Sequence, residues 1–93
     1  MKKLQNKEID ELYHAILTLE SLGECRSFFR DLLTELEIQE FAERWKVARM
    51  LADGTSYSQI VEETGLSSRT IARVGQWLRR GKGGYAMMVK KTK

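Results

Sequence analysis

Residues 57–76 read YSQIVEETGLSSRTIARVGQ, and this stretch contains two short helical patterns that meet at Gly65. The apolar members of the two patterns are Ile60, Val61, Leu66, Ile71 and Val74. At these spacings the apolar side chains of one helix can bury against those of the other, and glycine permits a tight connection between them. The stretch therefore predicts a helix-turn-helix.

The second helix of this motif, from Ser67 or Ser68 to about Arg80, has polar and basic residues at its start and on its outer face. Arginine can pair with guanine through two hydrogen bonds, and small hydroxyl side chains reach phosphates or base edges. A helix N-terminus also favours phosphate, and recognition helices carry their base-reading residues at this place. The residues expected to contact DNA are Ser67, Ser68, Arg69, Thr70, Arg73 and Gln76.

Charge is divided unevenly along the 93 residues. Residues 1–53 carry 8 Lys/Arg and 11 Asp/Glu, whereas residues 54–93 carry 8 and 2, so the two parts have net charges of −3 and +6. No acidic residue follows Glu63. A basic C-terminal part suits a polyanionic partner such as nucleic acid, although a solvated basic tail has the same composition.

Three further helices are predicted upstream from apolar residues spaced three and four apart. The first covers about residues 6–22 and stops at Gly23, and the second is short, over about 25–33. The third starts at a possible capping box, Thr34 to Glu37, and ends at Asp53-Gly54. Because no stretch alternates like a strand, we expect an all-α fold of five or six helices.

The end of the chain leaves two alternatives. Gly81-Lys82-Gly83-Gly84 ends the fifth helix, because glycine is unfavourable inside helices. The following residues, 85–93, then form either a frayed basic arm or a short helix that packs on a partner through Met87, Met88 and Val89.

A chain of this length, with 42% apolar and 31% charged residues, fits one globular domain. We expect a single helical DNA-binding domain over residues 1–93, with dimerisation helices at about 6–53, the helix-turn-helix at 57–80, and a glycine-rich turn and basic tail at 81–93. The apolar faces of the first three predicted helices are broad for so small a chain. A monomer would expose residues such as Leu17, Phe29 or Ile38, so a second copy is expected to cover them.

Several classes of protein are excluded by what the chain lacks. One cysteine, Cys25, cannot form an intrachain disulfide, and together with one histidine, His14, it falls short of a zinc ligand set or a catalytic pair. We expect no metal site, no catalytic residues and no enzymatic activity. The longest apolar run is 85–89, and Met1-Lys2-Lys3 precedes a polar helical pattern, so we expect a cytoplasmic protein with no membrane partner.

The segment from Asp31 to Arg80 resembles the Trp repressor family, and more closely its Trp repressor-like relatives of unknown ligand. The matching stretches are Leu32-Leu33-Thr34 with Glu37, Arg44, Leu51 to Gly54, Ser58-Gln59 and Thr70-Ile71-Ala72-Arg73. The resemblance implies an intertwined homodimer whose first three helices interlock with those of the partner. It also implies a transcriptional regulator, expected to be a repressor, that presents two helix-turn-helix heads to a palindromic operator.

The resemblance also identifies candidate effector-binding residues. Arg44 and Arg73 match the two arginines that flank bound tryptophan in the family. Val74, however, stands where tryptophan-responsive members have glycine, and Trp77 stands where they have a serine that helps to hold the amino group of the ligand. Both changes would narrow the pocket, so the resemblance argues against tryptophan as a corepressor, and no cofactor is required.

Two alternatives stay open. Arg44 could form a surface ion pair with Glu40 or Glu43 while Arg73 contacts a DNA phosphate. For the chain as a whole, the alternative function is a helical protein-interaction module or a non-specific nucleic-acid binder, whose basic C-terminal part is only a charge patch.

Overall fold

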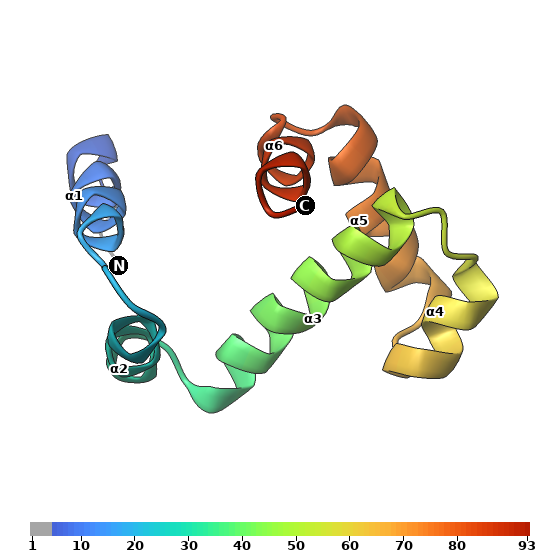
Figure 1. Cartoon of the computed structure of the whole chain (residues 1–93), viewed down its shortest axis with the longest axis horizontal. Helices are drawn as coiled ribbons and strands as arrows, with labels where there is room; N and C mark the ends of the chain where they lie inside the picture. The colour runs from blue at the N-terminus through green and yellow to red at the C-terminus, as the bar shows by residue number, and fades with distance from the viewer. Residues whose placement is uncertain (1–4) are drawn as a thin grey trace. The chain divides into compact units, whose positions relative to one another are not determined.

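The computed structural model describes residues 5–93, which form six helices and no strand (Figure 1). The helices are α1 (Asn6–Leu17), α2 (Leu22–Leu32), α3 (Glu35–Ala52), α4 (Tyr57–Thr64), α5 (Ser68–Arg80) and α6 (Gly84–Lys91). The predicted all-α class is therefore confirmed. None of the described helices is long and apolar enough to cross a membrane, and the Met1-Lys2-Lys3 start lies outside the described residues.

The helices fall into two compact units, a first unit up to Glu35 and a second unit from Leu36 onward. In the first unit, α1 ends at Leu17, so the predicted helix over 6–22 is too long. The first helix ends early because residues 20–24 form the N-terminal cap of the next helix, which the apolar spacing does not reveal. The Ser21 side chain accepts a hydrogen bond from the backbone N–H of Glu24 at 3.1 Å, and the Glu24 carboxylate accepts one from the backbone N–H of Glu20 at 2.8 Å. These bonds start α2, and Gly23, expected to be a stop, lies in its first turn.

Neither α1 nor α2 contains a buried residue. Leu17 is 79% exposed and Leu22 66%, while Phe28 and Phe29 are half-buried and their rings meet edge to face at 5.7 Å. The expectation that a single chain exposes Leu17 is confirmed, whereas Phe29 and Ile38 are each partly covered within their own chain. The described part of the first unit thus has an apolar surface and no core of its own.

The second unit contains a core shared by three helices. Its buried residues are Val47 and Ala48 of α3, Ile60 of α4, and Ile71 and Val74 of α5. Val61 and Leu66 pack against this cluster, as does Trp45, whereas Phe41 on the same helix is 50% exposed. The apolar seam expected between the two helices of the motif is therefore present, and α3 closes it from outside the motif.

The connection between α4 and α5 has the expected glycine. Gly65 adopts the left-handed conformation at φ 71°, and its N–H donates to the carbonyl oxygen of Val61. The Thr64 hydroxyl supports the turn by donating to the Ile60 carbonyl at 2.7 Å and accepting from the Leu66 N–H at 3.2 Å. A side chain at Gly65 would be strained in this conformation, which fixes the direction in which α5 leaves the turn.

Residues 84–91 form a helix, so the frayed-arm alternative is wrong. Helix α6 packs against α5 of its own chain (Figure 1). Its Val89 is buried, and the Tyr85 ring stacks on Trp45 of α3 with centroids 6.5 Å apart. Met87 and Met88 are 52% and 42% exposed. The short-helix alternative therefore holds, but Tyr85 and Val89 anchor it within the chain.

Candidate nucleic-acid interface

The start of α5 is held by two of the predicted DNA-contacting residues. Ser67 is the N-cap, and its hydroxyl accepts a hydrogen bond from the backbone N–H of Thr70 at 3.2 Å. The hydroxyl oxygens of Ser67 and Thr70 also lie 3.0 Å apart, within hydrogen-bonding distance. Both side chains order the first turn, while Ser68 beside them is exposed. Such a turn presents backbone N–H groups that suit a phosphate.

The exposed side of α5 carries a face that we call the reading face. It consists of Arg69, Arg73, Gln76 and Arg80, all exposed. Their spacings of four, three and four residues place them on one side of the helix, opposite the buried Ile71, Val74 and Gly75. Three of the predicted DNA-contacting residues thus share a surface that the core leaves free. The sequence pattern missed Arg80 as a fourth member, although continuing the same spacing by one turn would have identified it.

The electrostatics of α5 are uniform in sign. The helix SRTIARVGQWLRR has four arginines and no acidic residue. Arg79 and Arg80 lie in its last turn. The whole exposed length of α5 can therefore approach a polyanion without encountering a carboxylate on the same helix.

The candidate effector residues lie on separate helices, Arg44 on α3 and Arg73 on α5. The Arg44 side chain donates to the Glu40 backbone carbonyl at 3.4 Å, and its guanidinium lies 4.9 Å from the centre of the Phe41 ring. Val74 is only 3% exposed and fills the core. Trp77 is 53% exposed and packs closely on the backbone of Gly81, where a Cβ would collide with its carbonyl oxygen and ring.

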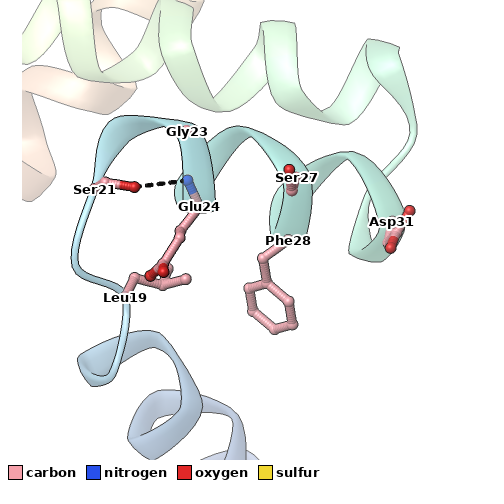
Figure 2. A pocket seen from close by; sticks show the side chains of 7 residues that line it. All are labelled: Leu19, Ser21, Gly23, Glu24, Ser27, Phe28 and Asp31. Atoms are coloured by element: carbon pink, nitrogen blue, oxygen red, sulfur yellow. Dashed lines mark hydrogen bonds between the residues drawn. The ribbon is translucent and has the colours of Figure 1, made fainter.

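The described residues contain no group of three or more His, Cys, Asp or Glu side chains that could hold a metal ion. They do contain an open hollow of about 500 Å³ along α2 in the first unit (Figure 2). It is lined by Leu19, Ser21, Gly23, Glu24, Ser27, Phe28 and Asp31. None of the predicted DNA-contacting or effector-binding residues lines this hollow. The predicted DNA-contacting residues lie on α5 and at its start, so the candidate site is the exposed surface of that helix.

The fold and the basic face of α5 define a DNA-binding regulator of the helix-turn-helix class. The chain belongs to the Trp repressor protein family, whose sequence profile matches residues 7–93. The family consists of DNA-binding regulators and not of enzymes. The resemblance found in the sequence is thereby confirmed.

Individual relatives are similar over nearly the full chain. The protein YerC of Bacillus subtilis (strain 168) is 47% identical over 91 residues, which cover 98% of this chain and 88% of YerC. The crystal structure of a TrpR-like protein from Eubacterium eligens ATCC 27750 superposes with a TM-score of 0.88 at 37% identity, covering 92% of this chain and 89% of that one. A candidate Trp repressor from Staphylococcus aureus gives 0.85 at 40% identity, covering 97% and 95%.

Proposed function

We propose that the chain is a sequence-specific transcriptional repressor that binds a palindromic operator as a homodimer. The observation that carries the proposal is the reading face: four exposed polar or basic side chains on the outer side of a recognition helix whose inner side is locked into the core. In this assignment residues 57–80 read DNA, residues 6–53 dimerise, and 1–93 act as one domain. Because the relatives named above come from bacteria, we expect the protein to act in the cytoplasm beside the chromosome.

The homodimer is supported by the surface that one chain leaves uncovered. Large apolar side chains are more than one-third exposed on all of the first three helices: Ile9, Tyr13, Leu17, Leu22, Leu32, Leu36 and Phe41. Exposed apolar side chains in such number mark an interface, and a two-fold dimer would relate the two α5 helices by the same symmetry. Each helix can then enter a major groove if the two lie about 34 Å apart, one turn of DNA.

The deciding experiment is selection of bound sequences from a random pool of duplex DNA. The proposed function requires an inverted repeat whose half-sites are about 10 base pairs apart, centre to centre. It also requires that the selected site be bound at least about 10³-fold more tightly than random duplex. A pool that yields no motif would favour the second candidate, a non-specific nucleic-acid binder, which the charge of +6 over residues 54–93 could support by itself.

Arg69→Ala should weaken binding to the selected operator by about 1–3 kcal/mol, because Arg69 is placed to reach a base edge. The fold should stay intact, since the side chain is exposed and outside the core. Fluorescence anisotropy with operator and random duplex measures both affinities. Arg26→Ala, which removes an exposed arginine from α2, is the matched control. If affinity for operator and for random duplex fell by the same factor, Arg69 would contact only a phosphate and not a base.

Free tryptophan should change operator affinity by less than about threefold. The Val74 side chain occupies core space, and Trp77 stands where the family's ligand would need a small polar residue. Operator titrations with and without added tryptophan measure the coupling between the two ligands. A tenfold tightening, which corresponds to about 1.4 kcal/mol, would show that Arg44 and Arg73 do form an effector site.

A further inference from the structure

Two polar side chains from different helices both approach Gly75, away from the reading face. A Cβ atom built on Gly75 would lie 3.0 Å from Nη1 of Arg79, 3.2 Å from the hydroxyl oxygen of Tyr57 and 3.3 Å from Cδ1 of Leu51. Gly75 is buried, so these groups cover its backbone. The absence of a side chain at Gly75 therefore leaves the space that both the guanidinium of α5 and the phenol of α4 approach.

The position of the Arg79 guanidinium follows from helix geometry. Side chains on an α-helix lean toward its N-terminus, so Arg79 reaches back one turn and places its charge beside Gly75 instead of at the end of α5. Among the described residues, no carboxylate forms an ion pair with Arg79. Tyr57 is 40% exposed and Arg79 is exposed as well. The pair therefore offers a positive charge and a hydroxyl donor at the surface.

We propose that Tyr57 and Arg79 together bind a backbone phosphate of duplex DNA at the edge of the groove that α5 enters. The inference rests on the proposed DNA-binding function and adds a contact outside the reading face. Guanidinium and phenol groups both donate hydrogen bonds to phosphate oxygens, and charged donors make the stronger ones. In a helix-turn-helix the first helix crosses the DNA backbone while the second lies in the groove.

The geometry of the pair suits that arrangement. Tyr57 is the first residue of α4, and Arg79 belongs to the last turn of α5. One phosphate held by both would tie the two helices of the motif to the same DNA strand. Phosphate contacts carry no sequence information, so this pair fixes how deeply α5 sits in the groove while the reading face distinguishes bases.

The test compares Arg79→Gln and Tyr57→Phe with the unaltered chain, on the selected operator and on random duplex, over a series of salt concentrations. Each neutralised phosphate contributes about 0.9 to the slope of log affinity against log salt. Arg79→Gln should lower the slope by about 0.9 per half-site and weaken both DNAs by the same factor, about tenfold. Tyr57→Phe removes a donor but no charge, so it should weaken both DNAs and leave the slope unchanged.

Two further variants separate binding from folding. Arg79→Lys keeps the charge and should keep the slope, and Arg26→Gln on α2 should change neither slope nor affinity. A lower melting temperature for Arg79→Gln with an unchanged salt slope would overturn the proposal, because Arg79 would then only cover Gly75. If random-pool selection finds no operator, the proposed repressor function fails, yet the slope change on random duplex still decides the role of Arg79.

Discussion

Ile71→Asp should abolish folding of the helix-turn-helix. Ile71 of α5 is fully buried in the core that α5 shares with α3 and α4, and every buried residue of that core is apolar. The variant loses the apolar burial of isoleucine and must also bury or expel a charge, two costs that together exceed about 4 kcal/mol. Native proteins are stable by about 5–15 kcal/mol, and small domains lie near the low end of that range, where such a loss removes most of the stability. Thermal unfolding followed by circular dichroism measures the loss.

Ala72→Asp is the matched control, because Ala72 is the next residue of the same helix and is exposed. It introduces the same carboxylate and should shift the melting temperature by only a few degrees, although it should weaken DNA binding. If Ile71→Asp melted cooperatively near the temperature of the unaltered chain, the side of α5 that faces the core would have been assigned incorrectly.

Phe41→Glu should dissociate the proposed dimer and with it operator binding. Phe41 is 50% exposed in its own chain, so a carboxylate there costs a lone chain little, whereas a dimer interface that covered it would bury an unpaired charge. Sedimentation of the unaltered protein should give about twice the 10.8 kDa chain mass, and the variant should give the chain mass alone. A monomer can contact only one half-site of a palindromic operator. We therefore expect at least a hundredfold loss of affinity, about 2.7 kcal/mol.

Gln39→Glu provides the control on the same helix. Gln39 is exposed and lies two residues before Phe41, on nearly the opposite side of α3, and the substitution adds the same carboxylate. It should leave mass and affinity unchanged. The dimer scheme would be contradicted if the unaltered chain and the Phe41→Glu chain sedimented with the same mass. It would also be contradicted if Phe41→Glu bound the full operator at unchanged affinity.

The helix-turn-helix could be predicted from the sequence because its determinants are local. Gly65, Ile60 and Ile71 lie within twelve residues, and helical spacing alone assigns each to the turn or the seam. The third element of that core could not be assigned in the same way. Val47 and Ala48 are completely buried, yet they stand on a helix whose apolar residues occur on several sides, so the pattern does not show which side the motif covers.

The boundaries of the first two helices depended on side-chain hydrogen bonds that compete with helix continuation. Gly23 was interpreted as a stop, but Ser21 and Glu24 form a cap around it, and a cap outweighs the modest cost of one glycine near a helix start. Residues 85–93 were ambiguous because Tyr85 finds its stacking partner, Trp45, forty residues earlier in the chain. Contacts at such separation leave no periodic signal.

The residues of the candidate site also differ in whether they depend on local sequence or on contacts between helices. Arg69, Arg73 and Gln76 could be predicted as candidates because one helix carries them all, and they share one exposed face of that helix. The Tyr57 and Arg79 pair was not identified, because it joins two helices across a buried glycine and depends on the angle at which they cross.

The distribution of the core along the chain also has a consequence for synthesis on the ribosome. All six buried apolar residues described here lie between Val47 and Val89. The N-terminal half therefore emerges first without anything to pack against, and no core can close until α5 has left the exit tunnel. At about 5–20 residues per second, synthesis up to the end of α5 at Arg80 takes about 4–16 s. Closure of the core therefore waits until α5 has emerged, and the apolar N-terminal helices are available to chaperones throughout that interval.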